Sequence, residues 1–569
     1  MPSRTTQLSQ ETPTERSPLL LQRESTLEYV THVAEDAPVA DIKHYNLAGM
    51  SQPLGVPSLT FGCCAFDGTI VAILLGTISS SFNALNMALL SVSCFTPLYG
   101  RLCDIFGRQA SLLIALSFFT VGNIMCAVAP TMNAMILARA IAGIGGGGLT
   151  SVASTITSDL VPITHRGIFQ GYANILFGLG SGLGAPIGGI ISDNLGWRWA
   201  FYLQVPMLVL AGTMIFFKVR YTIPSPSNSG SSTPVLKETT VQKLKKVDWL
   251  GSFILACSIG SILMAVSLKT SSIDEATGFA WSDPTIVGLF VAGAVSLVLF
   301  LAVELKFAVM PILPVELLTQ RTPVAVAINN LSISILSFGV MYTVPLYFTA
   351  VRLMTPSVAG YHLIPNSVLG ALGSLGNGFL VRHTGKYYWL TFFSGCFAVI
   401  SSCMLSTWDL DTSEWSLWTA FGPMAFSLGS VSTLTIVGLI ADIGREHVAV
   451  ATSLSYMFRT TGQVLGVSLS GALTQAILQR ELPKRITGPD APELIAQIRR
   501  SSDVIRQLPP ALQLAATQSY QKGLQAVFIC SIVFAVIGVI SALGMREVDM
   551  SPAAYAAKNR SAESDEEQS

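Results

Sequence analysis

Charged side chains are scarce in this sequence. Asp, Glu, Lys and Arg make up 12% of its 569 residues, and the two signs balance at a net charge of zero, whereas soluble domains carry about 25% charge. This balance excludes a global positive field that would attract nucleic acid. Hydrophobic residues make up 51% of the chain, more than the cores of a soluble protein of this size could bury. A lipid bilayer is the solvent that accepts such a surface.

Signatures of catalysis and of metal binding are also missing. The nine cysteines and six histidines show no spacing typical of a metal site, so no metal or other cofactor is expected. The glycine-rich run 143–148 lies in an apolar stretch and lacks the Gly-Lys-Ser/Thr ending of a nucleotide-binding loop. An enzyme, including an ATP-driven pump, is therefore disfavoured. We also expect no cleavable signal peptide.

Long apolar runs dominate the chain instead. A helix needs about 20 apolar residues to cross a bilayer, and the runs predict an all-α, polytopic membrane protein with about fourteen spans. The predicted spans are 57–79, 83–101, 110–129, 133–157, 168–191, 199–219, 249–268, 285–305, 323–350, 358–381, 388–406, 415–440, 447–478 and 524–545. The even count places both termini on one side. Lys and Arg concentrate in the short loops of that side, which predicts cytosolic termini.

Composition divides the chain into tails, halves and a linker. Both tails are polar and are predicted to be disordered and cytosolic. The linker is rich in Ser and Pro, which predicts flexibility. The predicted segments are a tail (1–55), an N-terminal six-helix half (56–219), a cytosolic linker (220–248), two extra helices (249–306), a C-terminal six-helix half (322–545) with a lumenal loop (479–523), and a second tail (546–569).

Two predicted cytosolic turns resemble each other. The sequences GRLCDIFGR (100–108) and GFLVRHTGK (378–386) share Gly, Leu, Gly and a base at the same spacing. Each turn follows the second helix of a predicted six-helix unit. Repeated halves that rock around a midplane site are the architecture of many secondary transporters. The repeat therefore predicts transport by alternating access.

The first of these turns resembles the signature of the major facilitator superfamily, GxLxDxxGR. Other stretches are similar to motifs of its fourteen-spanning drug:proton antiporters, and within that family the fungal vacuolar basic amino acid transporters are most similar. The resemblance implies the major facilitator fold, with two six-helix halves plus two extra helices. The stretches that carry it are FDGTIV (66–71), LARAIAGIG (137–145), GSGLGAPIGG (180–189), GWRWAFYLQVP (196–206) and FRTTGQVLG (458–466).

The resembling motifs assign certain residues to conformational change. Glycines allow two helix ends to approach closely, and the glycine-rich fifth span is suited to packing across the two halves. Asp104 is expected to face a helix N-terminus or a base and so to latch one conformation. The fifth-span motif is associated with exchange rather than uniport. The residues concerned are Gly100, Asp104, Gly107, Arg108, Gly180, Gly184, Pro186, Gly188 and Gly189.

Polar residues inside predicted spans are the candidates for transport. A charge within a bilayer is costly and therefore indicates function. Asp67 in the first span is expected to be a proton-linked carboxylate or a counter-charge for a cation, and Arg139 in the fourth span to bias a nearby carboxylate. A buried structural ion pair is the alternative for both. For Asn174, Gln204 and Asn330, the alternative is hydrogen bonding between helices.

The first tail also contains an acidic dileucine pattern, ERSPLL, formed by Glu15, Leu19 and Leu20. Such a signal is bound by sorting adaptors on cytosolic tails and indicates a vacuolar or lysosome-like membrane. A chance match is the alternative.

Three hypotheses follow from these patterns. The first is a proton-coupled antiporter that moves basic amino acids into the vacuole, with small solutes, protons, the bilayer and a sorting adaptor as partners. The second is efflux of drugs or secondary metabolites at the plasma membrane. The third is a non-transporting receptor or scaffold. The short second span slightly favours the third, because residues 86–99 cover about 21 Å of a core about 30 Å thick.

Overall fold

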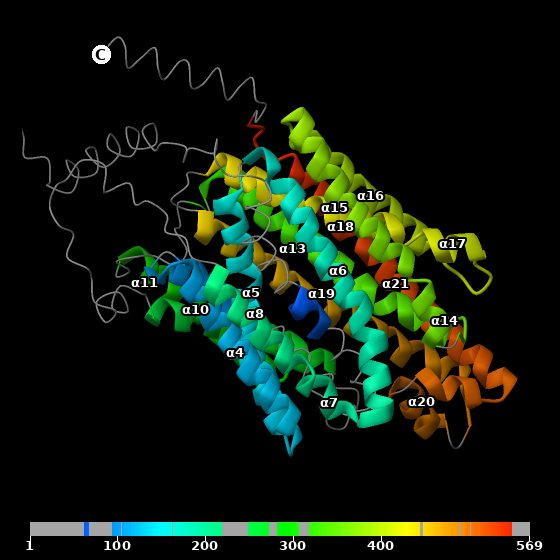
Figure 1. The fold of residues 1–569 in the computed structure, drawn as a ribbon. Helices are drawn as coiled ribbons and strands as arrows, with labels where there is room; N and C mark the ends of the chain where they lie inside the picture. Colours follow the sequence, from blue (N-terminus) through cyan, green and yellow to red (C-terminus); the bar gives the residue numbers. More distant parts are fainter. Residues whose placement is uncertain are drawn as a thin grey trace, which may run out of the picture.

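The computed structural model of this chain is a bundle of helices (Figure 1). It describes residues 62–67, 94–103, 105–161, 163–218, 249–271, 282–306, 317, 319–354, 356–443, 448–488, 491–500 and 502–548, and these contain no strand. The labelled elements are α4 (Arg108–Val128), α5 (Met132–Leu160), α6 (Ile163–Leu195), α7 (Trp197–Tyr202), α8 (Gln204–Lys218), α10 (Trp249–Ser271), α11 (Pro284–Lys306), α13 (Arg321–Ala350), α14 (Pro356–Tyr361), α15 (Ile364–Thr384), α16 (Tyr388–Ser406), α17 (Glu414–Thr419), α18 (Gly422–Asp442), α19 (Val448–Arg485), α20 (Ala491–Arg500), the 3₁₀ helix η4 (Ser502–Gln507) and α21 (Pro510–Ala542).

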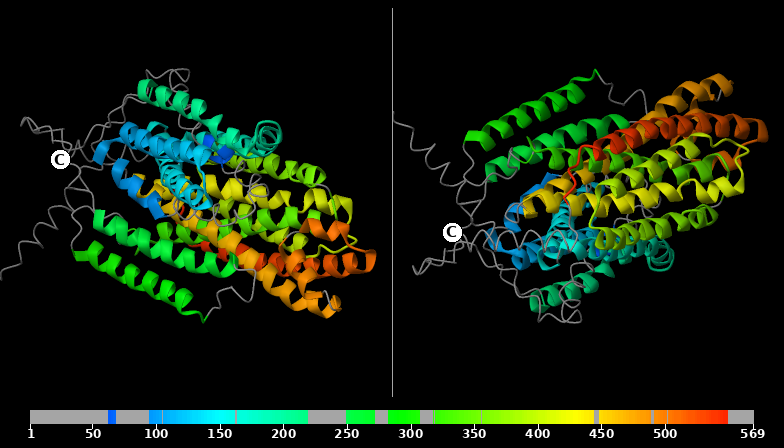
Figure 2. Two further views of the ribbon diagram at one scale, coloured as in Figure 1. Left: turned by 90° about the horizontal axis from the view of Figure 1, so that it is seen from below. Right: turned by 90° about the horizontal axis from the view of Figure 1, so that it is seen from above.

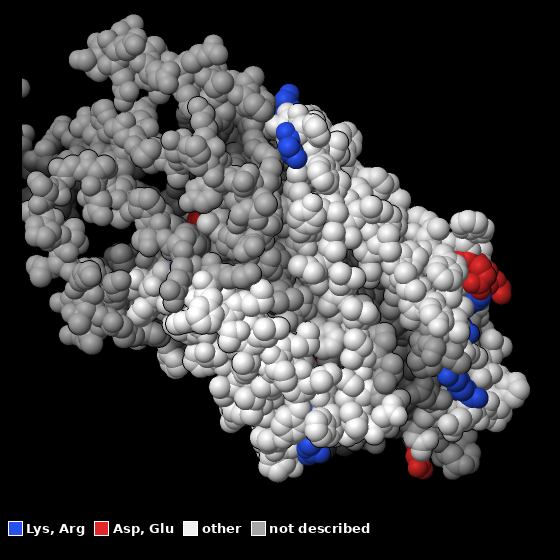
Figure 3. Space-filling model, viewed as in Figure 1, with Lys and Arg blue, Asp and Glu red and all other residues white. Residues whose placement is uncertain are grey.

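The outer surface of the bundle is suited to lipid. Within the described residues, eight helical segments are long and apolar enough to cross a membrane. On α11, the side chains of Val291, Val295 and Val298 are each more than half exposed, which water would disfavour and acyl chains accept. Charged side chains on the visible face lie toward its ends, and a broad band without them lies between (Figure 3). The protein is therefore a multi-pass helical membrane protein.

The third to fourteenth predicted spans all coincide with described helices, but three of them are broken in two. The pairs are α7 with α8, α14 with α15, and α17 with α18. Each break precedes a proline near the start of the second helix, at Pro206, Pro365 and Pro423. Proline has no N–H to donate and its ring clashes with the carbonyl four residues earlier, so it starts a helix more easily than it continues one. The predicted spans 57–79 and 83–101 lie largely outside the described residues.

Each half is held together by close approaches at glycine. A β-carbon added to Gly122 of α4 would lie 2.4 Å from the backbone nitrogen of Ala142 in α5. In the other half, a β-carbon at Gly466 of α19 would lie 2.4 Å from the carbonyl oxygen of Ile335 in α13. Such contacts bring backbones together in the way that small residues do in membrane helices.

The two ends of the bundle differ. We name the end with the turns 103–108 and 384–387 the motif end, and the end with α14, α17, α20 and η4 the cap end. Figure 2 shows α20 and η4, in orange, at the end opposite the last described residues. At 1.5 Å per residue, the 38 residues of α19 span about 57 Å, so this helix projects beyond a core about 30 Å thick.

The segment 479–523, expected as a loop, is largely helical. α19 runs on to Arg485, α20 and η4 follow, and α21 begins at Pro510 rather than at the expected residue 524. Polar residues lower the hydropathy here below that of a span, yet the segment buries Ile498 and Ile505 completely. The hydroxyl of Tyr520 donates to the carbonyl of Ile498 at 2.9 Å. Amphipathic helices therefore build a folded cap where a hydropathy argument sees a loop.

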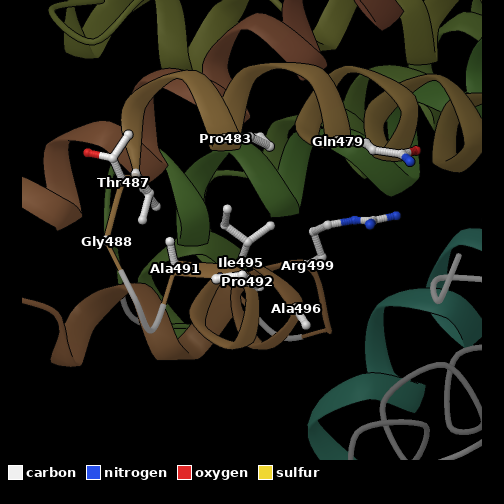
Figure 4. A pocket seen from close by; sticks show the side chains of 10 residues that line it. Gln479, Pro483, Thr487, Gly488, Ala491, Pro492, Ile495, Ala496 and Arg499 are labelled. Atoms are coloured by element: carbon white, nitrogen blue, oxygen red, sulfur yellow. The ribbon is translucent and has the colours of Figure 1, made fainter. Parts of the chain in front are cut away.

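A shallow groove runs between the end of α19 and α20 (Figure 4). The side chains of Ile495 and Arg499 point from α20 toward α19. Arg499 Nε donates to Gln475 Oε1 at 3.2 Å, and Gln475 Nε2 donates to the carbonyl of Arg499 at 3.2 Å. This reciprocal pair fixes α20 to the projecting part of α19.

An ion cluster on the same projection joins α19 to α21. Glu481 lies 2.8 Å from Lys484 Nζ, 2.7 Å from Arg485 Nη1 and 3.0 Å from Lys522 Nζ, the last on α21. Hydrogen bonds from these bases, first Lys484 and then Lys522 and Arg485, lower the pKa of Glu481 to about 2. The carboxylate therefore stays ionised in any acidic compartment.

The cluster predicts a specific acid sensitivity. A carboxylate with a lowered pKa contributes stability that is full above its unfolded pKa, about 4.3, and is lost as pH falls toward its folded pKa of about 2. Glu481→Gln should therefore lower the melting temperature of the purified protein equally at pH 7 and pH 5, and progressively less below pH 4. The matched control is Glu493→Gln, an exposed position on α20. A difference that stays constant down to pH 2 would contradict the assignment.

Candidate functional site

A buried ion pair connects the first described helical segment to α5. Arg139 Nη1 donates to Asp67 Oδ1 at 3.1 Å and Nη2 donates to Oδ2 at 2.6 Å. The two side chains are 4% and 3% exposed. The paired geometry matches the planar guanidinium to both carboxylate oxygens. The sequence predicted both residues as site candidates, and the structure brings them into direct contact.

The surroundings of this pair are apolar. The guanidinium carbon of Arg139 lies 6.0 Å from the ring centroid of Phe201 in α7. Cys126, Ala138 and Phe201 belong to one buried cluster, against which Phe66 packs. Each charge depends on the other, because an unpaired ion in such a buried site is very unfavourable. A proton or a cation that reaches Asp67 therefore changes the balance of forces on Arg139.

A second polar site joins the two halves. Asn174 of α6 donates from Nδ2 to Ser374 Oγ of α15 at 2.7 Å and to Ser432 Oγ of α18 at 3.1 Å. It also lies 3.4 Å from Thr433 Oγ1, and Ser374 and Thr433 bond to each other at 2.6 Å. Hydrogen bonds across an interface between moving parts hold one arrangement and must break in another. We name Asn174, Ser374, Ser432 and Thr433 the polar bridge.

The two halves also touch backbone to backbone near the polar bridge. A β-carbon at Gly378 of α15 would lie 2.6 Å from the carbonyl oxygen of Gly167 in α6, and one at Gly171 would lie 2.7 Å from Leu375 Cδ2. Gly167 and Gly378 both lie near the motif end, at the start of α6 and toward the end of α15. The motif end of the bundle is therefore closed between α6 and α15 in this structure.

The signature turn lies at the same end. Gly107 has φ 86°, a left-handed conformation suited to glycine, and Arg108 Nε bonds Asp159 Oδ2 of α5 at 2.8 Å. A β-carbon at Gly100 would lie 2.8 Å from Ser453 Oγ of α19, so this contact also closes the two halves. Asp104, predicted to act as a latch, lies outside the described residues.

One of the predicted fifth-span glycines, Gly180, packs in a different place from the expected one. A β-carbon at Gly180 would lie 2.3 Å from the carbonyl oxygen of Gly62, so Gly180 packs within its own half and not across the interface. Gly167 and Gly171, which lie about three and a half and two and a half turns earlier, make the cross-half approach instead. Gly184, Pro186, Gly188 and Gly189 lie farther along α6.

Gln204 and Asn330 are buried, and each forms hydrogen bonds within its own half. Gln204 Nε2 donates to the carbonyl of Ala200 at 3.1 Å. Asn330 Nδ2 donates to the carbonyl of Val326 at 3.1 Å and to Ser455 Oγ of α19 at 3.0 Å. These bonds fit the alternative interpretation, hydrogen bonding within the bundle. Glu15, Leu19 and Leu20 lie outside the described residues.

The polar bridge gives a measurable expectation. Asn174→Ala removes the donor while Ser374 and Thr433 keep each other as partners, so we expect closure of the motif end to weaken by about 1 kcal/mol, about fivefold in population. Spin labels at Phe217→Cys and Arg382→Cys, exposed positions of the two halves, would report a larger long-distance fraction. Asn377→Ala is the control, because Asn377 bonds to Ser430 within one half. An unchanged distance distribution in Asn174→Ala would contradict a bridging role.

A closed interface between two helical halves, with a buried ion pair in one of them, is typical of secondary transporters. The model of the Major Facilitator Superfamily matches residues 58–467. The chain belongs to this superfamily.

Relatives in yeasts share most of this chain. A multidrug resistance protein of Schizosaccharomyces pombe, fnx1, is 34% identical over 86% of this chain and 92% of its own length. The vacuolar membrane amino acid uptake transporter fnx2 of the same organism is 31% identical over 86% of this chain and 83% of its own length. Vacuolar basic amino acid transporter 1 of Saccharomyces cerevisiae is 30% identical over 77% and 80%, respectively.

Solved structures confirm the fold. The human organic anion transporter MFSD10 aligns with a TM-score of 0.53 at 12% identity, covering 85% of this chain and 99% of that one. A bacterial homologue of the lysosomal transporter Spinster, inward-facing and unoccupied, aligns with a TM-score of 0.53 at 14% identity, covering 88% and 98%. At these identities the likeness concerns the fold.

Proposed function

We propose that this chain is a proton-coupled antiporter that moves basic amino acids into the vacuole. The observation that carries the coupling is the buried pair of Asp67 and Arg139, held at 2.6 and 3.1 Å in an apolar setting. A charge in such a place is costly and therefore indicates function, and protonation of Asp67 removes one charge of a mutually dependent pair.

The proposed cycle alternates the state of this pair with the state of the motif end. When Asp67 is ionised it neutralises Arg139, and the bundle holds the closed motif end described above. Protonation of Asp67 leaves Arg139 without its counter-charge, so an arrangement that supplies another partner or solvent becomes favourable. The contacts at Gly167 with Gly378 and at the polar bridge then open. A cationic substrate acts on the same carboxylate, so proton and substrate alternate rather than bind together.

The substrate class and the membrane rest on several supports. Two relatives bear names that refer to vacuolar transport of amino acids, and one of these names specifies basic amino acids. The dileucine pattern at Glu15, Leu19 and Leu20 favours delivery to a vacuole-like membrane by a sorting adaptor. In the proposed topology the termini and the motif end face the cytosol, and the cap end faces the lumen. No enzymatic step enters the proposal.

The test is uptake into vacuolar vesicles from a fungal host that lacks its own basic amino acid carriers and expresses this chain. We expect ATP-dependent uptake of labelled Lys, Arg or His that a protonophore abolishes. Vesicles that contain the protein and show no uptake would overturn the substrate assignment.

Efflux at the plasma membrane is the second candidate. It is favoured by the 34% identity to a relative named for multidrug resistance. Localisation of the tagged protein separates the two candidates, because efflux requires the plasma membrane and vacuolar import requires the vacuole. Replacement of Glu15, Leu19 and Leu20 by alanine should redirect a vacuolar protein to another membrane.

A further inference from the structure

A histidine at the cap end is enclosed by aromatic rings. His362 lies between α14 and α15 and is 6% exposed. Its ring centroid lies 4.3 Å from that of Trp418 in α17 and 5.0 Å from that of Phe348 in α13. The imidazole is thus packed between α17 and α13 of the C-terminal half, and its two nitrogens have defined surroundings.

The surroundings of Nδ1 determine the tautomer. Nδ1 lies 2.9 Å from the carbonyl oxygen of Val358, one turn earlier. A carbonyl oxygen is an acceptor only, so Nδ1 must carry the hydrogen of the neutral ring. Nε2 then presents a lone pair. Among the described residues, Nε2 is buried and has no hydrogen-bond partner.

That lone pair faces a carboxylate. His362 Nε2 lies 3.7 Å from Glu414 Oε2 at the start of α17. Two acceptors facing each other across this gap repel, whereas a proton on Nε2 turns the contact into an ion pair that becomes a charge-assisted hydrogen bond when the two atoms move closer. The second oxygen, Oε1, already pairs with Arg352 Nη2 at 3.4 Å. One carboxylate can therefore hold both cations, one on each oxygen.

Three other charged side chains lie near this contact. Arg352 follows α13 and donates both to Glu414 and to the carbonyl of Leu410. Asp409 and Asp411, in the connection between α16 and α17, are exposed. Within the part of the chain that the structure describes, Glu414 is the carboxylate that pairs with His362.

We propose that His362 and Glu414 form a proton-operated link between two hairpins of the cap end. Histidine changes charge in the range between pH 5 and pH 8. When Nε2 holds a proton, the link joins the connection between α14 and α15 to the start of α17, which leads into α18. Without that proton the cap end lacks this link, and α15 and α18 are joined by packing and by bonds farther along, such as the one between Ser374 and Thr433.

The link acts on the helices that meet the other half. Ser374 of α15 and Thr433 of α18 belong to the polar bridge, and both helices continue from the elements that His362 and Glu414 join. Acid on the cap side thus stiffens the pair of helices that holds the motif end closed. This consequence for transport rests on the proposed function, in which the cap end faces an acidic lumen.

A double-mutant cycle tests the link without any substrate. The full chain is purified in detergent, and thermal unfolding is measured at pH 7.5 and pH 5.0 for the wild type, His362→Gln, Glu414→Gln and the double variant. We expect a coupling between the two positions that shifts the melting temperature by about 2 °C at pH 5.0 and falls toward zero at pH 7.5. The control is His383→Gln, an exposed histidine at the motif end, which should show no such coupling with Glu414.

Tryptophan fluorescence gives a second readout, which is needed if the variants of the cycle do not fold. A protonated imidazole stacked on an indole quenches its fluorescence, so acidification to pH 5.0 should dim the wild type more than Trp418→Phe. Equal dimming in both, or a coupling of the same size at both pH values, would overturn the proposal. Neither measurement uses transport. If vesicle uptake fails while the pH-dependent coupling appears, the link stands and the substrate assignment falls.

Discussion

We expect Asp67→Asn to abolish proton-linked uptake and also to destabilise the protein. The substitution leaves Arg139, 4% exposed, as a buried charge without a counter-ion. Removal of one partner from a buried pair costs about 3–5 kcal/mol in free energy of unfolding. Uptake in vacuolar vesicles and thermal unfolding of the purified protein measure the two effects separately.

The double variant Asp67→Asn/Arg139→Gln separates structure from coupling. It removes both charges, so most of the lost stability should return, because a neutral pair replaces an unpaired ion. Uptake should stay absent, because no titratable carboxylate remains at this site. The control is Asp409→Asn, an exposed carboxylate of the cap end, which should behave as the wild type. Uptake restored in the double variant would mean a structural pair, and an unchanged phenotype in Asp67→Asn would favour the receptor or scaffold hypothesis.

Gly378→Val should lower uptake about a hundredfold. Its β-carbon would lie 2.6 Å from both the carbonyl carbon and the oxygen of Gly167. The obstacle is backbone, which cannot rotate away as a side chain can, so α6 and α15 must separate. An overlap that costs about 3 kcal/mol changes the population of the closed motif end by about a hundredfold. The spin-label pair at Phe217→Cys and Arg382→Cys should report an increased distance.

The matched control lies two residues away on the same helix. A β-carbon at Gly376 meets nothing within 4 Å, so Gly376→Val changes helix propensity by a similar amount without crossing the interface. We expect wild-type distances and uptake there. If Gly378→Val instead transports normally with the motif end closed, then the contact with Gly167 is not part of the cycle.

The sequence predicts the fold well because a bilayer imposes a simple rule. Runs of about 20 apolar residues are needed to cross it, and α4 and α16 lie within two residues of the spans so predicted. Where the rule does not apply, the prediction fails. The cap is amphipathic rather than apolar, so the projecting turns of α19 and the early start of α21 at Pro510 escape a hydropathy criterion.

The candidate site also contains residues that the sequence predicts and residues that it does not. Asp67 and Arg139 are identifiable because ions are rare in apolar stretches. Ser374 and Thr433 are not, because Ser and Thr are common in these helices and their importance comes from an asparagine that is 200 and 259 residues away in the chain, respectively. Gly378 belongs to the repeated turn, but its partner Gly167 depends on which helices meet across the halves, and that pairing is tertiary.

The extra helices have a mechanical consequence. α10 and α11 are tied to each other by Ser258 Oγ, which donates to the carbonyl of Gly293 at 2.9 Å. Leu255 and Phe300 pack with Leu454 and Met457 of α19 in one apolar cluster. Toward the N-terminal half, the thiol of Cys94 contacts the carbonyl of Ala256 at 3.4 Å. When the halves rock, the hairpin of α10 and α11 should move together with α19. The surface along which it slides against the N-terminal half should lie beside Cys94.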